Sequence, residues 1–273
     1  MNPEHLLDSP LGKEVEYSRQ YDARLLYPML RENLWIKRGH TKAPYVGVDI
    51  WNAYEISWLN NRGLPRVAVG EFRVPSNSPN LIESKSLKLY LCSFAQTRFS
   101  DKEKVTERIQ SDLSVCAGAN VEVEIRKLGE CPERLSELQG TCLDDLDIEI
   151  NTYERNSDLL QTEEGAEIRE TIYSNLLKSN CPVTGQPDWG SVFIDYVGSP
   201  IDHASLLRYI VSYREHSDFH EQCLENIFLD MLERCGPREL AVYARYLRRG
   251  GLDINPYRSN NHRSVENCRL ERQ

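Results

Sequence analysis

The chain has 273 residues, 40% of them apolar and 27% charged, and a formal net charge of −9. These values are typical of a soluble globular protein with one large domain or two small ones. The negative charge argues against binding to nucleic acid phosphates, because proteins that do so usually present a basic face. No apolar run approaches the roughly 18–20 residues that cross a bilayer. We therefore expect a small anionic ligand, with neither direct nucleic acid binding nor membrane contact.

The cysteines and the N-terminal sequence bear on the compartment. The segment 1–5 lacks the basic and apolar regions of a signal peptide, and the eight cysteines are scattered singly with no C-x-x-C pair. In a chain without an export signal, this usage predicts reduced thiols and a cytoplasmic location.

The first half reads as an irregular arm followed by strands and helices. Residues 1–44 predict an arm with one or two short helices, and residues 46–58 and 66–74 predict a β-hairpin around Asn60–Pro65. Asn80 and Ser100 each precede an acid by three positions, at Glu83 and Glu103, which predicts a capping box at the start of each of two helices. Strict alternation predicts strands at 121–125 and 147–150.

The second half follows the same order of elements. The pattern predicts, in turn, a helix over 163–178, a strand over 192–197, helices over 202–215 and 218–233, and a strand over 240–247. We expect an α+β protein with an arm (1–44) and two similar modules (45–155 and 156–273), each an antiparallel sheet with helices on one face.

Cys181 lies in a segment rich in turn residues, seven positions before Asp188. Pro182, Gly185, Pro187 and Gly190 predict an irregular, shaped loop here, and an apolar strand follows it. A thiol and a proton donor on such a loop suit nucleophilic catalysis. The alternative is a buried cysteine beside an aspartate of a turn.

Three further polar clusters stand at predicted element ends: Glu83–Lys88, Phe219–Glu221 and Arg248–Asp253. Each also has a structural reading. Glu83 and Glu221 can be capping acids, His220 an ordinary residue of a first helical turn, and the arginines a solvated strand end. Paired zinc ligands are absent from the sequence, so we expect no metal. No G-x-G-x-x-G fingerprint is present, so a nicotinamide cofactor would need another scaffold, with Lys85 and Arg249 on its phosphates.

In combination these motifs resemble the NADPH-dependent 7-cyano-7-deazaguanine reductases, the nitrile reductases of queuosine biosynthesis, in their long, two-module class. The resemblance rests on five further stretches of the sequence besides Glu83–Lys88: Asp49–Trp51, Leu177–Cys181, Gln186–Gly190, Phe219–Cys223 and Arg248–Pro256. It covers nearly the whole chain except the first forty or so residues and the tail after Ser259.

The resemblance implies a tunnelling fold (T-fold), in which antiparallel sheets from several modules close into a barrel with helices outside. One chain has too few modules for a barrel, so a homodimer is expected. The implied activity is reduction of the nitrile of 7-cyano-7-deazaguanine to 7-aminomethyl-7-deazaguanine by two molecules of NADPH, through a covalent thioimide and without metal.

The resemblance also gives the residues roles. Cys181 would be the nucleophile and Asp188 the acid, with His220 beside the nitrile. Substrate contacts would come from Ile82, Glu83, Ser84, Phe219, His220 and Glu221. NADPH contacts would come from Ser84, Lys85, Arg249 and Gly250, the arginine lying near the 2′-phosphate. Two alternatives stay open: a purine or pterin hydrolase of the same fold, which would need a metal and no NADPH, and a non-catalytic purine-binding protein.

Overall fold

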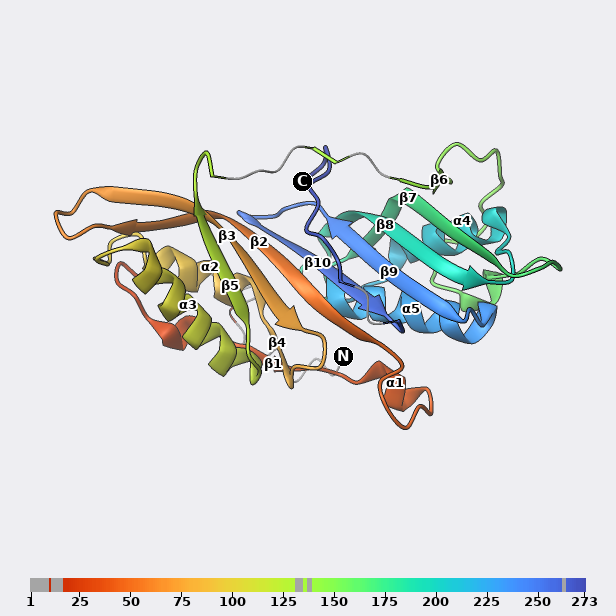
Figure 1. The fold of residues 1–273 in the computed structure, drawn as a ribbon, viewed down its shortest axis with the longest axis horizontal. Helices are drawn as coiled ribbons and strands as arrows, with labels where there is room; N and C mark the ends of the chain where they lie inside the picture. The colour runs from red at the N-terminus through yellow and green to blue at the C-terminus, as the bar shows by residue number, and fades with distance from the viewer. Residues whose placement is uncertain (1–9, 11–16, 131–134, 137–138, 262–263) are drawn as a thin grey trace. The chain divides into compact units, whose positions relative to one another are not determined.

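The computed structural model describes residues 10, 17–130, 135–136, 139–261 and 264–273 (Figure 1). The part of the predicted arm at 1–9 and 11–16 lies outside the described residues. The chain forms two compact units, one from residues within 1–32, 48–134 and 248–254, the other from 33–47, 135–247 and 255–273. Both contain antiparallel strands and α-helices, so the mixed α+β class predicted from the sequence is confirmed.

Unit 1 is built around the antiparallel strand order β5-β3-β2. Strands β2 (Val46–Leu59) and β3 (Pro65–Pro75) form the predicted hairpin, and β5 (Glu122–Lys127) pairs with β3. Helices α2 (Ser84–Ser93) and α3 (Lys102–Ala117) supply Leu87, Tyr90, Ile109 and Leu113 to the core. The remaining elements are η2 (Ala23–Leu25), β1 (Pro28–Leu30) and β4 (Asn80–Ile82), the last two paired with each other.

Unit 2 has the strand order β10-β9-β8-β7-β6. The long strands are β7 (Ile168–Asn180), β8 (Pro187–Gly198), β9 (Glu239–Tyr246) and β10 (Leu252–Ser259). The first three residues of β10 belong to unit 1. The short strand β6 (Thr141–Cys142) runs parallel to β7, and the other pairs are antiparallel. The helical elements are α1 (Leu34–Lys37), η3 (Ser157–Leu159), α4 (His203–Val211), η4 (Ser212–Glu215) and α5 (His220–Cys235).

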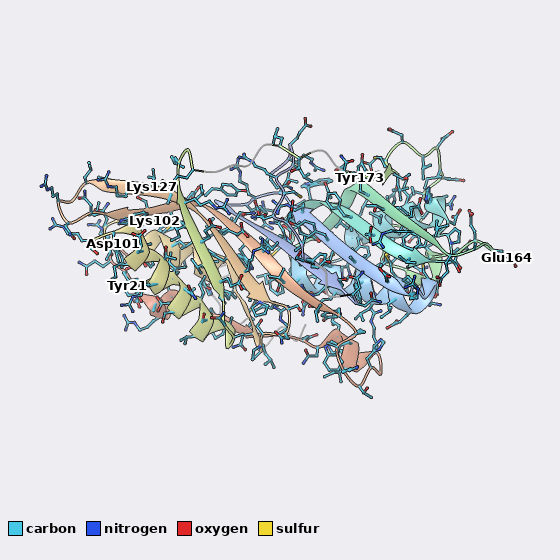
Figure 2. The ribbon with its side chains drawn as sticks, viewed as in Figure 1. Tyr21, Asp101, Lys102, Lys127, Glu164 and Tyr173 are labelled. Carbon is cyan, nitrogen blue, oxygen red and sulfur yellow. The ribbon has the colours of Figure 1, made fainter. Side chains whose placement is uncertain are left out.

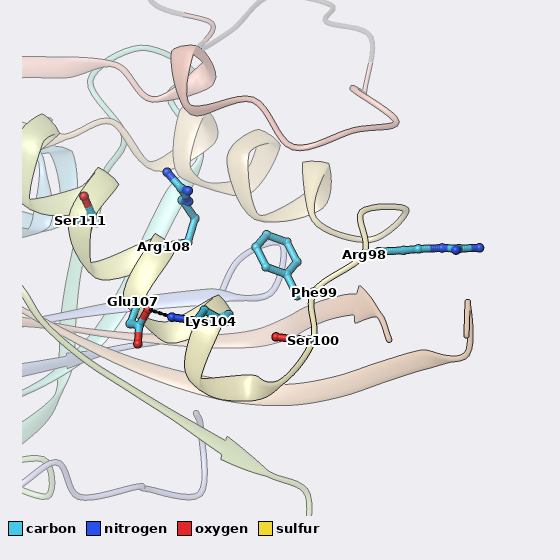
Figure 3. Close-up of a pocket in the computed structure, with 7 residues that line it drawn as sticks. All are labelled: Arg98, Phe99, Ser100, Lys104, Glu107, Arg108 and Ser111. Atoms are coloured by element: carbon cyan, nitrogen blue, oxygen red, sulfur yellow. Dashed lines mark hydrogen bonds and ion pairs between the residues drawn. The ribbon is translucent and has the colours of Figure 1, made fainter. Parts of the chain in front are cut away.

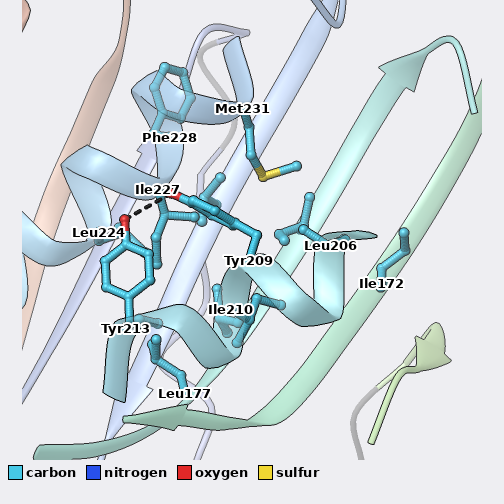
Figure 4. Close-up of a cluster of buried hydrophobic side chains, with 14 of the residues drawn as sticks. Ile172, Leu177, Leu206, Tyr209, Ile210, Tyr213, Leu224, Ile227, Phe228 and Met231 are labelled. Atoms are coloured by element: carbon cyan, nitrogen blue, oxygen red, sulfur yellow. Dashed lines mark hydrogen bonds between the residues drawn. The ribbon is translucent and has the colours of Figure 1, made fainter. Parts of the chain in front are cut away.

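The core of unit 2 lies between one face of this sheet and helices α4 and α5 (Figure 4). Ile172, Leu177, Tyr209, Ile227 and Phe228 are fully buried there. Burial of a side chain of this size stabilises the fold by about 1.5–3 kcal/mol. The other sheet face carries a row of rings, in which Phe193 lies between Tyr173 (centroids 6.2 Å apart) and Tyr243 (6.0 Å), with Tyr173 labelled in Figure 2.

Two predicted elements are wrong. The segment predicted as a helix over 163–178 instead contains strand β7, which pairs with β8. Ile168, Ile172 and Leu176 stand four apart, a spacing that suits one face of a helix, yet only Ile172 of the three is buried. The same spacing also places side chains on one face of a strand. The predicted strand at 147–150 has no regular structure, and its isoleucines pack half-buried against the core without a partner strand.

The predicted helix starts also differ in detail. Glu83, not Asn80, is the N-cap of α2. Asp101, labelled in Figure 2 beside Lys102, the first residue of α3, is the N-cap of that helix in place of Ser100. Each carboxylate accepts backbone N–H groups directly, so neither helix needs the predicted box. Helix α5 begins at His220 behind Phe219, and no side chain caps it. The alternative interpretation of Glu221 as a capping acid, in a box begun by Asp218, does not fit this helix start.

Candidate active site

Cys181 occupies the tight turn that joins β7 to β8. Its backbone N–H donates to the carbonyl of Gln186 (2.9 Å), and its carbonyl accepts from the N–H of Gly185 (3.0 Å). Gly185 has φ +66°, a conformation that glycine adopts at little cost. The turn residues Val183 to Gln186 are exposed, whereas Cys181 itself is 7% exposed. A short, hydrogen-bonded hairpin turn therefore holds the thiol in a fixed place.

Asp188 lies on strand β8, opposite Ser179 of β7, and is 4% exposed. The prediction that the whole segment up to Gly190 is an irregular loop is thus wrong. Pro187 is the first residue of β8, where the missing N–H is tolerated, and Gly190 continues the strand. The strand gives the carboxylate a firmer support than a loop would.

Asp188 and His220 form a close pair. Nε2 of His220 lies 3.2 Å from Oδ2 of Asp188, and their side chains are 11% and 4% exposed. The imidazole ring lies parallel to the ring of Tyr246, with centroids 3.9 Å apart and planes inclined by 4°. A carboxyl group and an imidazole in contact can hold and move one proton, which is the requirement of general acid–base catalysis.

The other predicted residues of unit 2 stand at the beginning of α5. Phe219 is half-buried at the N-cap position, and Glu221 is 3% exposed in the first turn. Burial raises the pKa of the nearby Cys223 thiol to about 12, so this cysteine stays protonated at neutral pH and is a poor nucleophile. Cys223 is also fully buried in the core of unit 2, whereas Cys181 lies in the turn, so position favours Cys181 as the nucleophile.

Glu83 is the central residue of the predicted site in unit 1. It is fully buried between β4 and α2, and its two carboxylate oxygens accept from the N–H groups of Lys85 and Ser86, both at 2.7 Å. Burial raises the pKa of Glu83, although these hydrogen bonds and the positive charges of Lys88 and Lys85 oppose the shift. Ile82 precedes it in the core and Ser84 follows it as the first residue of α2.

The predicted cofactor residues also belong to unit 1. Arg249 and Leu252 close a turn by backbone hydrogen bonds, with the N–H of Arg249 on the carbonyl of Leu252 at 2.8 Å. Within this turn Gly250 has φ +56°, and a Cβ there would meet Nζ of Lys88 at 3.1 Å. Lys88 of α2 thus lies against the Arg249 turn, and lysine and arginine are the side chains that bind phosphate groups.

The structure therefore divides the predicted residues between the units. Unit 2 brings Asp188 and His220 into contact and places Cys181, Phe219 and Glu221 on the same β7-turn-β8 and α5 elements, whereas Ile82, Glu83, Ser84, Lys85, Arg249 and Gly250 belong to unit 1. The sequence analysis gave no role to Lys88 or Tyr246. Lys88 had a signal, since it stands one helical turn after Lys85; Tyr246 had none, because strand pairing brings it to His220.

A cleft of about 510 Å³ in unit 1 contains none of these residues (Figure 3). It lies beside α3, and its cations have other partners: Lys104 is paired with Glu107 at 2.7 Å, and Arg108 lies over the ring of Tyr21. Within the described residues there is no group of three or more His, Cys, Asp or Glu side chains that could hold a metal ion. No helix in that part of the chain is long and apolar enough to cross a membrane.

A buried thiol in a hairpin turn and a carboxyl–imidazole pair on the next strand and helix are groups of the kind that enzymes use for nucleophilic and acid–base catalysis. Residues 17–125 match the family model described as "Nitrile reductase, 7-cyano-7-deazaguanine-reductase N-term", and residues 187–265 match "QueF-like protein". The NADPH-dependent 7-cyano-7-deazaguanine reductases of Burkholderia multivorans and Burkholderia pseudomallei are 55% and 53% identical to this chain, over the full length of each. The chain belongs to the 7-cyano-7-deazaguanine reductase family.

One solved structure shares a weaker likeness. The archaeosine synthase QueF-Like in its apo form aligns with 37% of this chain and 100% of its own, at a TM-score of 0.32 and 14% identity. That likeness is too slight to bear on the fold or on the site.

Proposed function

We propose that this protein reduces the nitrile of 7-cyano-7-deazaguanine to the primary amine with NADPH, in queuosine biosynthesis. The observation that carries the proposal is the placement of Cys181 in the hairpin turn that leads into β8, the strand on which Asp188 pairs with His220. The relatives that are 53–55% identical over their full length carry the name of this activity.

In the proposed mechanism the Cys181 sulfur adds to the nitrile carbon while the nitrile nitrogen takes a proton from Asp188, so that C≡N becomes a thioimide. Covalent capture converts a poor hydride acceptor into a C=N bond that accepts hydride readily. NADPH, when bound, supplies hydride to the carbon in each of two reductions. Between them the C–S bond breaks and Cys181 leaves as thiolate, and two hydrides and two protons complete the amine. His220 holds Asp188 in place and receives or returns its proton.

The substrate contacts follow from the acidic groups. Glu83 and Glu221 are buried carboxylates, which accept hydrogen bonds and so suit the N–H edge of a deazapurine. Each oxygen of Glu83 already accepts one helix N–H, and a carboxylate oxygen has a second lone pair for a ligand. Phe219 would cover the base, and Ile82 and Ser84 would contribute through their backbone.

The NADPH contacts follow from the basic side chains of unit 1. Ser84, Lys85, Arg249 and Gly250 would bind the phosphates, and Lys88 joins them because its side chain lies against Gly250. Arg249 near the 2′-phosphate would account for the preference for NADPH over NADH. Phosphate binding by such cations needs no metal ion.

We further propose that the sheets belong to the T-fold and close into a barrel in a homodimer, in the cytoplasm and without direct nucleic acid contact. The row of Tyr173, Phe193 and Tyr243 supports an assembly, because it lies on the sheet face opposite the core formed with helices α4 and α5. Aromatic side chains are enriched at protein interfaces.

The test is the intact mass of the protein mixed with 7-cyano-7-deazaguanine in the absence of NADPH. We expect a gain equal to the mass of the substrate, which disappears when NADPH is added and the amine forms. Cys181→Ala should show no gain while still binding the substrate, and Cys142→Ala, which removes an exposed cysteine of β6, should behave like the unaltered protein. Tight binding without an adduct in the unaltered protein would favour a hydrolase or a binding protein.

A further inference from the structure

His220 is held in an unusual way. Its Nε2 faces Asp188 at 3.2 Å, while its Nδ1 is buried and has no hydrogen-bond partner among the described residues. The orientation of a functional histidine is ordinarily fixed by a hydrogen bond from its second ring nitrogen to a carbonyl or carboxylate. Here that hydrogen bond is missing, so another contact must define the plane of the ring.

The ring of Tyr246 supplies that contact. The two rings are 3.9 Å apart at their centroids and parallel within 4°, which is van der Waals contact across the whole imidazole face. A tilt of the imidazole would drive its edge into the tyrosine, so the stack restricts rotation about the side-chain bonds of His220. Burial, and then the neighbouring Cys223 thiol, hold the pKa of Tyr246 well above its ordinary value, so the ring stays neutral.

The position of Tyr246 is itself fixed by the sheet. Its backbone N–H donates to Oδ1 of Asn255 (3.0 Å), and its carbonyl accepts from Nε2 of Gln273 (3.3 Å). In the β8–β9 register it stands opposite Gly190, and a Cβ at Gly190 would approach Cδ1 of the tyrosine ring to 3.1 Å. Because Gly190 has no side chain, the ring of Tyr246 can occupy the space beside it.

Gly190 and Asp188 are two residues apart on β8, so they share one face of the sheet. We propose that Tyr246, seated on Gly190, is a positioning residue that holds the imidazole of His220 against Asp188. The proposal deepens the function proposed above and rests on it in one respect, namely that the Asp188–His220 pair acts on the substrate. It also gives a reason for the glycine two positions after the acid.

The test uses two substitutions at Tyr246 and one at Gly190. Tyr246→Phe keeps the flat ring, Tyr246→Leu removes it at similar volume, and Gly190→Ala pushes it away by a few tenths of an ångström. Phe228→Leu is the control, because it removes a fully buried ring from the same unit, in contact with Tyr45 rather than His220. Thermal unfolding of all four variants shows how much each loses in packing alone.

The first readout is the imidazole ¹⁵N signal of His220 by NMR, assigned with His220→Gln. We expect the chemical shift of this signal to change in Tyr246→Leu and Gly190→Ala and to remain unchanged in Tyr246→Phe and Phe228→Leu. The second is the rate of the mass gain with 7-cyano-7-deazaguanine, which should fall by about 10- to 100-fold in Tyr246→Leu, since misplacement by about 1 Å can cost that much. Tyr246→Phe should remain within about twofold of the unaltered protein.

An unmoved His220 signal and an unaltered adduct rate in Tyr246→Leu would overturn the proposal. If that variant does not fold, the same result in Gly190→Ala would overturn it. Failure of the proposed function has a different signature, namely no mass gain in the unaltered protein. The NMR comparison still decides the role of Tyr246 in that case, because it needs no turnover.

Discussion

Helices α2 and α5 both begin beside a buried acid, but the acid is held differently in each. At α2, Glu83 is the N-cap and both its oxygens accept N–H groups of its own helix. At α5 no side chain caps the first turn, and the carboxylate that meets His220 comes from β8. Local sequence thus fixes the acid of unit 1, whereas tertiary packing fixes the acid of unit 2.

Because of this difference, substitutions of the two acids are expected to change different properties of the protein. Loss of Glu83 removes a helix cap together with a proposed substrate contact, so stability and activity should change together. Asp188 lies within strand β8 and is not the N-cap residue of a helix, so we expect its replacement by asparagine to affect chemistry more than the fold.

The largest effect is expected from Asp188→Asn, which keeps the shape of the side chain and removes its acidic proton. Positioned acid catalysis contributes about 10²- to 10⁴-fold, so adduct formation at Cys181 should slow by that factor. The measurement is the time course of the mass gain with 7-cyano-7-deazaguanine.

The matched control is Asp195→Asn on the same strand, whose carboxylate pairs with Arg169 at 2.8 Å and is partly exposed. Its adduct rate should equal that of the unaltered protein. An unchanged rate in Asp188→Asn would remove Asp188 from the role of acid, and a slowed rate in both variants would point to a general effect of strand β8.

A smaller effect is expected from Glu83→Ala compared with Asp101→Ala, which replace the N-caps of helices α2 and α3 of unit 1. Each should lower the free energy of unfolding, and loss of a cap costs about 0.5–2 kcal/mol in hosts where it has been isolated. Only Glu83→Ala should also lower kcat/KM, by about 10- to 100-fold, because a hydrogen bond to a charged group is worth about 1.5–3 kcal/mol. Equal kcat/KM in the two variants would show that Glu83 is a cap and nothing more.

The sequence predicted the elements whose signals are local. The β2–β3 hairpin follows from alternation around a turn, and α3 follows from apolar residues four apart at Val105, Ile109 and Leu113, all fully buried. The same reasoning failed at β7, because residues four apart lie on one face of a strand as well as on one face of a helix. Local patterns cannot show which strand supplies the partners.

For the site, too, the sequence predicted local features but not the contacts between elements. The residue types of Cys181, Asp188 and His220 could be selected from motifs, but their contact could not, because β8 and α5 meet only in the folded unit. Capping by Glu83 was missed for a related reason: the pattern Asn80–Glu83 suits a box, whereas strand β4 extends through Ile82 and moves the helix start to Ser84.

A further comparison concerns two turn glycines, Gly250 of unit 1 and Gly185 of unit 2, with φ +56° and +66°. Alanine at either should cost about 1 kcal/mol, because a side chain disfavours this backbone conformation. Only at Gly250 would the new methyl group meet a neighbour, Lys88, since nothing lies within 4 Å of a Cβ at Gly185. We expect a several-fold increase in the KM for NADPH in Gly250→Ala, measured by steady-state kinetics, and an unchanged KM in Gly185→Ala. An equal KM in both would exclude Lys88 from the proposed NADPH site.

The smallest effect concerns acid stability and has opposite signs at the N-caps of α2 and α3. Burial raises the pKa of Glu83 above its ordinary 4.5 in the folded state, so the fold binds this proton more tightly than the unfolded chain. The stabilisation from Glu83 is therefore fully present below pH 4.5 and is lost as the pH rises through the folded pKa. Relative to Glu83→Gln, the unaltered protein should lose free energy of unfolding as the pH rises from 4.5 through the folded pKa of Glu83.

At Asp101 the sign is reversed. The hydroxyl of Ser100 and then the N–H of Lys104 hold the pKa of this carboxyl below its ordinary 3.8. Its stabilisation is present above pH 3.8 and is lost as the pH falls through the folded pKa. Chemical denaturation between about pH 3 and pH 7 gives the free energy of unfolding at each pH. The difference between the unaltered protein and the variant should change with pH in opposite directions for Glu83→Gln and Asp101→Asn. Changes in the same direction would mean that the hydrogen bonds from Lys85 and Ser86 outweigh the burial of Glu83, and that its carboxylate is held ionised as firmly as an exposed cap.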